Sequence, residues 1–385
     1  MEQLIKLLPH GTQWNIPRQQ LVRQFSPVVE PMSRTEQNPV YHGEGTVWAH
    51  TKAVCEALVK LPEFEKLSEQ KQQVLFLAAL LHDVGKISTT RKEDGKWVSP
   101  NHAPVGARMA RQLLWLEWGL CGTQKAQQLR ETVCNLIRYH SIPAHVIDDP
   151  DGKRKLLSIA ANGALCPMFD LELLCLLAQA DALGRICGDQ NRMLEQVGLC
   201  RELARESDCL NGPFAFSSDH ARQGYLSGRT AQPQVELFDD TWGPVILLSG
   251  LPGTGKDTFI RQHYPELPVV SLDQLRQQLG VSPTDKQSPV LEAAREQART
   301  FLREKQPFVW NATNLSPMVR ARQLELFADY NACTRIEFLE TPWSEQLRRN
   351  AQRKDAVPEQ AICHMLEQLV LPEAKEAHQI RWHCV

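Results

Sequence analysis

A glycine-rich segment with the sequence GLPGTGK, residues 250–256, constrains the fold of this chain more than any other feature. It follows the short apolar run PVILLS and opens DTFIRQHY, in which apolar residues recur at helical spacing. Three further strand-like runs, LPVVSLD, FVWNATN and TRIEFLE, alternate with helical segments downstream. Strands that alternate with helices pair in parallel and are covered on both faces. The sequence therefore predicts an α/β domain with a parallel sheet over residues 242–385.

The N-terminal part is predicted to be a separate, helical domain. Between Thr46 and Gly188 the clearest segments carry apolar residues at helical spacing, and strand-like alternation is absent. Residues 211–241 are rich in Gly, Pro, Ser and Asp and lack periodicity, which is typical of a linker. A chain of 385 residues has room for two cores. We therefore predict an all-α bundle over residues 1–210, a linker over residues 211–241, and the α/β domain.

Composition indicates the cellular compartment of the chain and bears on its substrates. Neither the first residues, MEQLIKLLPHG, nor any later run is long and apolar enough for a signal peptide or a membrane span. The eleven cysteines form no CxxC pair, and several, such as Cys175, lie in apolar helical patterns, which favours a reducing cytoplasm. The formal net charge is −2. Binding of a polynucleotide substrate would therefore require a local cluster of basic residues, because the chain as a whole is not basic.

Histidine and aspartate side chains in the helical part are candidates for a metal site. His82 and Asp83 end the apolar run VLFLAAL, and Asp181 lies within the apolar segment LELLCLLAQADALGRI, where an unpaired carboxylate would cost several kcal/mol. Further candidates lie in helical or helix-edge contexts, namely His50, His102 and His140. Taken singly, each has a simpler explanation. A lone histidine is more often a surface or core residue, Asp83 can belong to a helix C-terminal turn, and Asp181 can accept hydrogen bonds from a neighbouring helix.

The donor types predict the chemistry of such a site. Imidazoles and carboxylates together suit a borderline divalent transition metal such as Mn²⁺, Co²⁺, Ni²⁺ or Zn²⁺. A cation of this kind lowers the pKa of a bound water and polarises a phosphoryl oxygen, which supports hydrolysis of a phosphoester.

The order of these residues resembles the HD superfamily of phosphohydrolases. The segments HGEGTVWAHT, LLHDVGK, NHAPVGARMA, RYHSI and QADALGR match successive family positions. The pattern is most similar to the HD domain of bacterial CCA-adding enzymes, which acts on 2′,3′-cyclic phosphate and 2′-phosphate ends. The resemblance implies four primary metal ligands, His50, His82, Asp83 and Asp181. It assigns a second metal or the substrate phosphate to His102 and His140, and Lys86 could pair with a phosphate oxygen.

The glycine-rich segment predicts a nucleotide phosphate site. Its backbone N–H groups and the following helix N-terminus favour phosphate, and Lys256 would reach the β- and γ-phosphates. The Ser or Thr that usually holds Mg²⁺ is replaced by Asp257, and Thr258 is turned by about 100° from that position. Asp257 could hold Mg²⁺ directly or through water; the alternative is a nucleotide site with poor catalysis. The predicted ATP-binding residues are Gly250, Leu251, Pro252, Gly253, Thr254, Gly255, Lys256, Asp257 and Thr258.

Charged residues downstream could complete a kinase. Asp273 and Arg276 follow the second strand, where a carboxylate can take a proton from an attacking hydroxyl and an arginine can grip an acceptor phosphate. Asp273 could instead be only a helix N-cap. Arg349 and Arg353 share one helix face and could clamp the transferring phosphoryl group. The simpler explanation is a solvated basic face, because the run also contains Arg348 and Lys354.

The segments GLPGTGKDT, SLDQLRQQL, WNATNLSP and TPWSEQLRRNAQRKDAVP resemble phage-type polynucleotide 5′-kinases. That likeness implies Asp273 as the general base on a 5′-hydroxyl and Arg276 as the ligand of the adjacent phosphate. Arg349 and Arg353 would be lid arginines on ATP. Asn311 to Asn314 would line the acceptor side, although Ala312 stands where the phage motif carries an aspartate.

Together the two halves resemble the bacterial bifunctional HD-domain polynucleotide kinases of RNA end healing. The resemblance implies hydrolysis of 2′,3′-cyclic, 2′- or 3′-phosphate RNA ends and ATP-dependent phosphorylation of 5′-hydroxyl ends of RNA, possibly also of DNA, with sealing left to a separate ligase. A second hypothesis is an enzyme of nucleotide metabolism, a nucleotide phosphohydrolase fused to a nucleoside or small-molecule kinase. A third is a P-loop domain that binds nucleotide weakly and acts as a regulatory or docking module.

Overall fold

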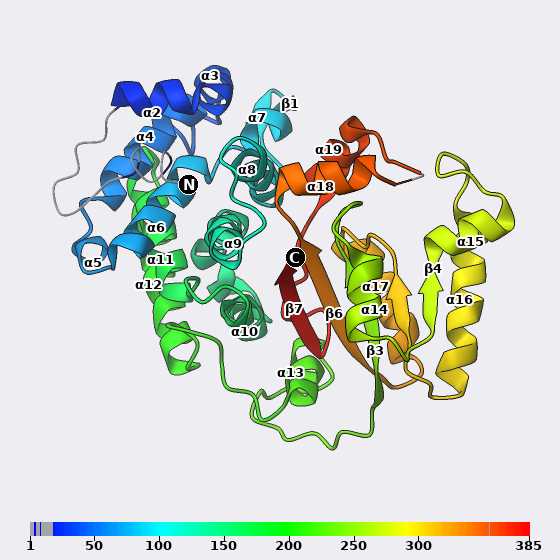
Figure 1. Cartoon of the computed structure of the whole chain (residues 1–385). Coiled ribbons are helices and arrows are strands. Elements are labelled where there is room, and N and C mark those ends of the chain that lie inside the picture. The colour runs from blue at the N-terminus through cyan, green and yellow to red at the C-terminus, as the bar shows by residue number, and fades with distance from the viewer. Residues whose placement is uncertain (1–3, 5–7, 9–17, 354) are drawn as a thin grey trace. The chain divides into compact units, whose positions relative to one another are not determined.

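The computed structural model describes residues 4, 8, 18–353 and 355–385. The chain divides into two compact units (Figure 1). The first comprises Met1–Leu120 and Lys125–Phe214, and the second comprises Cys121–Gln124 and Ala215–Val385. The segment MEQLIKLLPHG, in which we expect no signal peptide, lies almost entirely outside the described residues.

The first unit is helical, as predicted. Its α-helices are α2 (Arg18–Gln24), α3 (Ser26–Arg34), α4 (Val47–Leu58), α5 (Pro62–Glu65), α6 (Glu69–Leu81), α7 (Lys86–Thr89), α8 (His102–Leu116), α9 (Gln124–Tyr139), α10 (Gly152–Ala160), α11 (Leu171–Leu183) and α12 (Gln190–Glu206). Short 3₁₀ segments join them, η1 (Ile142–Ala144), η2 (Val146–Asp148) and η3 (Ala161–Ala164).

Helices α6 and α11 form the centre of this unit because both are apolar nearly all round. Every residue from Gln72 to Leu81 in α6 is buried, and α11 buries most of its residues. Both helices begin at a side-chain cap, since Ser68 accepts a hydrogen bond from the Lys71 N–H and Asp170 accepts one from the Leu173 N–H. Helix α4 packs against both of them. A polar side chain on the buried face of any of these three helices therefore lies in the core.

The expectation that residues 46–188 lack strands is wrong at one place. Strands β1 (Arg91–Glu93) and β2 (Lys96–Val98) form an antiparallel hairpin. Its two-residue turn consists of Asp94 and Gly95, with φ of 48° and 76°. An Asp-Gly pair favours this turn because both positions need positive φ. The local turn signal therefore outweighs the helical pattern on either side.

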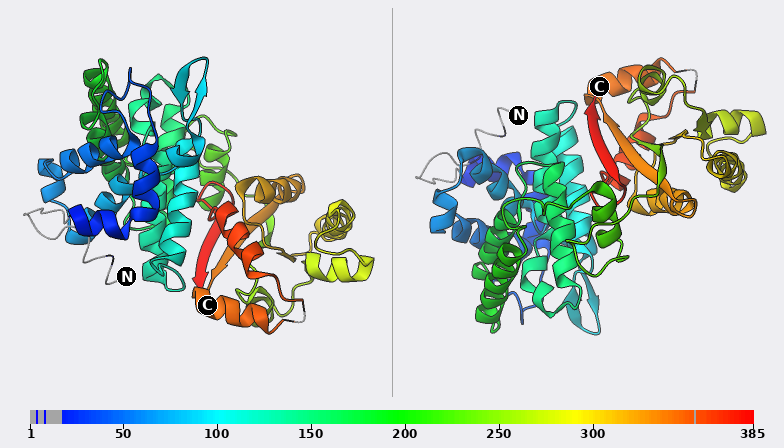
Figure 2. Two further views of the ribbon diagram at one scale, coloured as in Figure 1. Left: turned by 90° about the horizontal axis from the view of Figure 1, so that it is seen from above. Right: turned by 90° about the horizontal axis from the view of Figure 1, so that it is seen from below.

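The second unit contains the predicted parallel sheet. Its strands are β3 (Trp242–Ser249), β4 (Val269–Ser271), β5 (Val309–Asn311), β6 (Ala332–Glu340) and β7 (Gln379–Cys384), in the order β4-β5-β3-β6-β7. All four pairings are parallel. Its helices are α13 (Asp219–Leu226), α14 (Lys256–His263), α15 (Leu272–Leu279), α16 (Ser288–Arg303), α17 (Pro317–Ala328), α18 (Trp343–Ala351) and α19 (Glu359–Gln368). Figure 2 shows the sheet from two further sides.

Helices cover both faces of this sheet. On one face, Val245 and Leu247 of β3 pack with Ala294 of α16 and Phe327 of α17. On the other, Ile246 and Leu248 of β3 pack with residues of α14, Phe259 and Ile260. Successive residues of β3 thus point to opposite apolar layers, as a parallel sheet covered on both faces requires. The predicted fold class is confirmed.

The predicted linker over residues 211–241 contains one helix, α13. Ser218 caps it by accepting a hydrogen bond from the Ala221 N–H. Arg222 of α13 donates to the carbonyl oxygens of Ala377 and His378 within the second unit. The boundaries at residues 210 and 242 stay a prediction.

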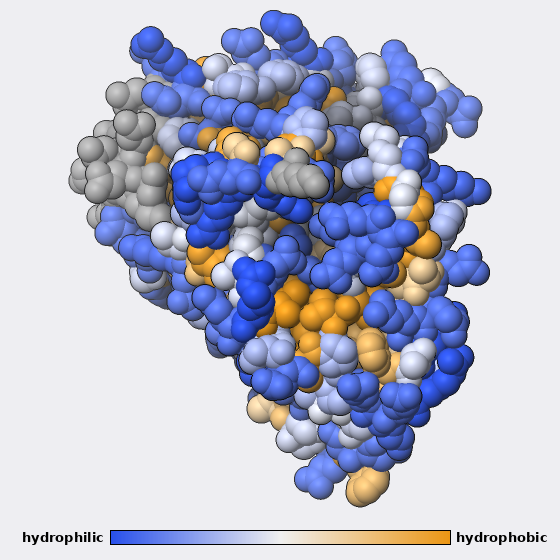
Figure 3. Space-filling view, turned by 45° about the vertical axis from the view of Figure 1, so that its right-hand side comes forward, coloured by the Kyte–Doolittle hydropathy of each residue, from blue (hydrophilic) through white to orange (hydrophobic). Residues whose placement is uncertain are grey.

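Most of the surface visible in Figure 3 is hydrophilic, and apolar residues gather there in smaller patches. Among the described residues, no helix combines the length and the apolar character needed to cross a membrane.

Candidate active sites

The six predicted metal-site residues of the helical unit come together. His50 lies on α4, His82 caps the end of α6, and Asp83 follows it. His102 opens α8, His140 follows α9, and Asp181 lies in the last turn of α11. All are buried except His102, whose side chain is 25% exposed. Solvent therefore reaches this cluster at His102, and the side chains of the other five residues are buried.

Each histidine presents its Nε2 atom to the centre of the cluster. The Nδ1 atoms of His82, His102 and His140 contact the carbonyl oxygen three residues earlier, at 2.8, 2.9 and 2.7 Å. Nδ1 of His50 lies 2.8 Å from Oε1 of Glu44. Because a carbonyl oxygen can only accept, it holds the proton on Nδ1 of His82, His102 and His140 and leaves their Nε2 atoms as lone-pair donors. This is the arrangement of histidine ligands in metal sites.

Asp83 lies between two pairs of histidines. Its Oδ2 is 3.7 Å from Nε2 of His50 and 3.3 Å from Nε2 of His82. Its Oδ1 is 3.5 Å from Nε2 of His102 and 4.0 Å from Nε2 of His140. Within each pair the two Nε2 atoms are 3.4 Å apart. One carboxylate therefore faces two neighbouring groups of potential ligand atoms.

Asp181 completes the first group. Its Oδ1 is 3.0 Å from Nε2 of His50 and 4.0 Å from Nε2 of His82. Arg185, one turn further along the chain, contacts both carboxylate oxygens at 3.1 and 2.8 Å. Burial alone would raise the pKa of Asp181, but Arg185 and His50 outweigh it and hold that pKa well below its usual range. The Asp181 side chain is therefore a carboxylate, the form that binds a cation.

Lys86 also lies in the cluster. Its ammonium is 2.8 Å from Oδ2 of Asp83 and donates to Gln37 at 2.7 Å. Burial would raise the pKa of Asp83, but Lys86 and the neighbouring histidines hold it well below its usual range. The structure thus places Lys86 on Asp83, a predicted metal ligand, and whether Lys86 also pairs with a phosphate oxygen stays a prediction. Arg185, which was not predicted as a site residue, is a second positively charged side chain at the same site.

The charge states of the histidines suit a metal. Burial lowers the pKa of His102 and lowers that of His140 to about 3, so both rings are neutral ligands. For His50, burial also acts to lower the pKa, but Asp181 and Glu44 outweigh it and the pKa is raised. A cation bound to His50 would therefore displace a proton from Nε2.

The residues fit a divalent cation. Oδ1 of Asp83 is buried, and no described residue donates a hydrogen bond to it. Burying such an oxygen without a partner is costly, and a bound cation would compensate it. Two groups of three ligands have their donor atoms within 4.8 Å of one another, namely His50, His82 and Asp181, and Asp83, His102 and His140. Nitrogen and oxygen donors of this kind suit transition metals without selecting one.

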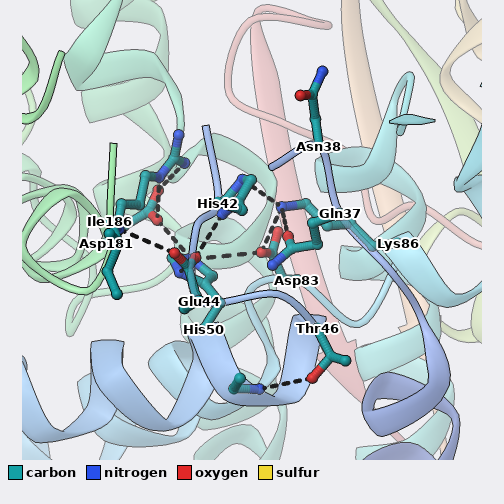
Figure 4. Close-up of polar contacts among 12 residues, drawn as sticks. Gln37, Asn38, His42, Glu44, Thr46, His50, Asp83, Lys86, Asp181 and Ile186 are labelled. Atoms are coloured by element: carbon teal, nitrogen blue, oxygen red, sulfur yellow. Dashed lines mark hydrogen bonds and ion pairs between the residues drawn. The ribbon is translucent and has the colours of Figure 1, made fainter. Parts of the chain in front are cut away.

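Residues 37, 42, 44 and 185 also contribute to this site, and none of them was predicted from the sequence. Arg185 could have been found from its spacing, since it lies four residues after Asp181 and so on the same helix face. Gln37, His42 and Glu44 lie in a loop without periodicity. Only the packing of that loop against the helices brings them to the cluster (Figure 4).

The glycine-rich loop of the second unit joins β3 to α14. Gly250, Gly253 and Gly255 have φ of 151°, 83° and 85°. A Cβ on Gly253 would lie 2.6 Å from the carbonyl oxygen of Gln346, so no side chain fits there. Lys256 donates to the carbonyl oxygens of Gly250 and Leu251 at 2.9 Å each and thus curls back over the loop. Burial lowers its pKa to about 8.

The remaining loop residues support this shape. Leu251, Pro252 and Thr254 are buried, and Thr254 donates through Oγ1 to the carbonyl oxygen of Leu251 at 2.9 Å. Gln346 of α18 donates to the carbonyl oxygen of Pro252 at 3.0 Å. Helix α18 therefore holds the loop through Gln346. The N–H groups at the start of α14 form the kind of site that binds phosphate.

Asp257 and Thr258 differ in their surroundings. Asp257 accepts a hydrogen bond from Nδ2 of Asn311 at 2.7 Å, at the end of β5. Thr258 is exposed and accepts a hydrogen bond from Arg261. Asn311, which the resemblance places on the acceptor side, thus contacts the residue at the usual Mg²⁺-binding position. An oxygen ligand for Mg²⁺ is available at Asp257.

The predicted acceptor and lid residues lie close together. Asp273 forms ion pairs with Arg276 and, at 3.4 Å, with Arg353. Arg276 also donates to Gln287 at 2.8 Å, which orients its guanidinium. Arg349 pairs with Glu345 and extends over the loop, where its Nη1 lies 3.3 Å from the position that a Cβ on Gly255 would take. Asp273 thus contacts two other predicted catalytic side chains, and Arg349 reaches the glycine-rich loop.

The other two basic residues of this run are not placed in that group. Arg348 is exposed and pairs with Glu345. Lys354 lies outside the described residues.

Comparison with protein families agrees with both units. Residues 47–185 match the family model of the HD domain. Residues 245–372 match a family model described as an AAA domain, a group of P-loop domains. The first match spans every predicted metal-site residue, and the second spans the glycine-rich loop and the charged group beside it. The chain therefore joins an HD domain, of the metal-dependent hydrolase type, to a kinase-like P-loop domain.

Proposed function

We propose that this chain is a bifunctional enzyme that heals RNA ends. The HD domain would hydrolyse 2′,3′-cyclic phosphate and 2′- or 3′-phosphate ends, and the P-loop domain would transfer the γ-phosphate of ATP to 5′-hydroxyl ends. The observation that carries the proposal is the contact between Asp273 and Arg276 within the kinase-like domain. A carboxylate for a hydroxyl and a guanidinium for a phosphate suit an acceptor that has both groups, as a polynucleotide 5′ end does.

In the HD domain the residues would hold and orient the scissile phosphate. A divalent cation bound by the histidines and carboxylates would lower the pKa of water and polarise the phosphoryl oxygen. Asp83 lies between the two ligand groups, and its carboxylate oxygens would help to hold a cation there. Arg185 and Lys86 supply positive charge at the carboxylates, which offsets part of the repulsion toward an anionic substrate.

In the kinase-like domain, transfer would depend on positioning and charge. Asp273 would accept the proton of the attacking 5′-hydroxyl, and Arg276 would hold the phosphate next to it. Lys256 would bind the β- and γ-phosphates of ATP, while Arg349 and Arg353 would compensate the charge that develops on the transferred group. Asp257 would hold Mg²⁺ in place of the usual hydroxyl.

The test uses one RNA that carries a 5′-hydroxyl and a 2′,3′-cyclic phosphate, with ATP, Mg²⁺ and a panel of Mn²⁺, Co²⁺, Ni²⁺ and Zn²⁺. Both ends are mapped. Lys256→Ala is expected to abolish 5′ phosphorylation and leave phosphate removal intact, and His82→Ala combined with Asp83→Ala is expected to do the reverse. Loss of both activities from either change would contradict the assignment of one reaction to each domain.

The second hypothesis, an enzyme of nucleotide metabolism, predicts a different acceptor. Nucleosides have no phosphate beside the 5′-hydroxyl for Arg276 to bind. If nucleosides are phosphorylated more efficiently than a 5′-hydroxyl oligonucleotide, that hypothesis replaces ours. If nucleotide binds but no acceptor supports ATP turnover, the P-loop domain is a binding module. A cytoplasmic location and a separate ligase as partner are further parts of the proposal.

A further inference from the structure

The loop between α3 and α4 contributes polar side chains to the metal cluster. Gln37, His42 and Glu44 are directed inward (Figure 4), and the side chain of Glu44 is only 7% exposed. Burying a carboxylate is costly unless it is well paired. The match to the HD family model begins at residue 47, so this loop lies outside it. The loop is thus a separate component of the site whose contribution has to be derived from its own contacts.

Glu44 is held by three groups at once. Its Oε1 is 2.8 Å from Nδ1 of His50 and 2.8 Å from Nδ1 of His42. Its Oε2 accepts a hydrogen bond from the Ile186 N–H at 3.0 Å. The neighbouring residue, Gly43, donates its own N–H to the carbonyl oxygen of Ile186 at 2.9 Å. The carboxylate is therefore fixed between the start of α4 and the segment that follows α11.

Glu44 differs from the partners of the other three histidines. His82, His102 and His140 are each oriented by a carbonyl oxygen of their own turn, three residues earlier. His50 depends on a charged side chain that lies outside its helix. A carboxylate paired with one ring nitrogen of a metal-binding histidine orients the imidazole and favours the proton on that nitrogen, which leaves the other nitrogen for a cation.

We propose that Glu44 is the positioning residue of the HD metal centre, which holds His50 with Nε2 directed at the cation. This inference rests on the proposed metal-dependent function of the HD domain. It assigns Glu44 a role through His50 and makes the loop at residues 42–44 part of the centre. Because the same loop is fastened to Ile186, five residues after Asp181, it ties the two ligands of one group to each other.

The alternative is that Glu44, His42 and His50 hold a cation themselves, because their donor atoms lie within 4.8 Å of one another. Their contacts argue against it. Both oxygens of Glu44 are already engaged. Nε2 of His42 lies 3.4 Å from the ammonium of Lys86 and is engaged there. The group is therefore better suited to orient His50 than to coordinate a metal.

The experiment measures metal binding directly, by titrating Co²⁺ into the metal-free full-length protein with calorimetry and recording the visible absorption of the bound ion. Glu44→Gln is expected to weaken Co²⁺ binding by about 10- to 100-fold and to leave the number of bound ions unchanged at saturation. Glu44→Asp, which keeps the charge, is expected to recover part of the affinity. Glu36→Gln is the matched control, because Glu36 lies in the same segment and is exposed.

Each other outcome has a defined meaning. Wild-type affinity in Glu44→Gln would overturn the inference, and so would the loss of a whole bound ion at saturation, which would make Glu44 a ligand. If the wild-type protein binds no Co²⁺, Mn²⁺, Ni²⁺ or Zn²⁺, the proposed function fails and the inference fails with it.

A measurement on the wild-type protein guards against misfolded variants. Nitrogen-15 NMR of the imidazole rings, loaded with diamagnetic Zn²⁺, reports which ring nitrogen of His50 carries the proton. We expect the proton on Nδ1. A proton on Nε2 would overturn the inference whether or not the variants fold.

Discussion

Gly85→Ala is expected to force apart two elements that carry metal ligands. Gly85 follows Asp83 closely and has helical backbone angles, φ −65° and ψ −21°, so alanine meets no backbone obstacle of its own. A Cβ at this position, however, would lie 2.0 Å from the carbonyl oxygen of His102 and 2.5 Å from the N atom of Gly106. Both atoms belong to the main chain of α8, so no side chain can turn aside to make room.

The size of the effect follows from these distances. An ordinary contact of a Cβ begins at 3.4 Å, so α8 must move by more than an ångström. Overpacking of this kind costs about 1–3 kcal/mol, and we expect the upper end because backbone must shift. Alanine also lowers the conformational entropy of the unfolded chain, which would offset at most about 1 kcal/mol of this loss of stability. His102 opens α8 and moves with it, and a displacement of about 1 Å can reduce catalysis by about 10²-fold.

Hydrogen–deuterium exchange of peptides from α8 measures the loosening of this helix. Co²⁺ titration and phosphoesterase assays then measure the consequence for the HD site. The matched control is Gly198→Ala in α12, where a Cβ would meet nothing within 4 Å. That change is expected to stabilise its helix by up to about 1 kcal/mol. If Gly85→Ala exchanges as slowly as the wild type and binds Co²⁺ equally well, the close approach of Gly85 to α8 does not set the geometry of the site.

Two further predictions concern the kinase-like domain. Glu376→Gln would remove the negative charge that pairs with the fully buried Arg320 guanidinium at 2.6 and 2.8 Å. The change is expected to destabilise this domain by about 3–5 kcal/mol in urea denaturation; an unchanged midpoint would contradict this. Burial lowers the pKa of His378 from its ordinary value of 6.5 to about 4, so the unfolded form takes up a proton first as the pH falls. The contribution of the neutral His378 ring to the free energy of unfolding is thus fully present above pH 6.5. It decreases as the pH falls toward 4, by at most about 1.4 kcal/mol per pH unit. His378→Gln should flatten this part of the stability profile, and an equally steep profile in that variant would assign the acid sensitivity elsewhere.

The predictable part of the fold was encoded in local patterns. The strand before GLPGTGK and the helix after it appear as expected, because an apolar run and a glycine turn are short-range signals. Strand β7, with the sequence QIRWHC, was not predicted, since it has no continuous apolar run. It lies at the edge of the sheet beside β6, and pairing with that neighbour is what makes it a strand. Helix α13 was likewise hidden in a segment without periodicity.

The sequence by itself determined the residue types, their order and the helices that carry them. A carboxylate within an apolar helix, as at Asp181, was sufficient to indicate a buried partner. Tertiary structure alone decided that Asp83 faces two pairs of histidines, that Arg185 and Lys86 neutralise the carboxylates, and that Glu44 orients His50. Contacts at this site join positions up to 142 residues apart, as between Glu44 and Ile186. A local pattern specifies which face of a helix is buried, whereas the packing of helices against one another decides which buried side chains meet.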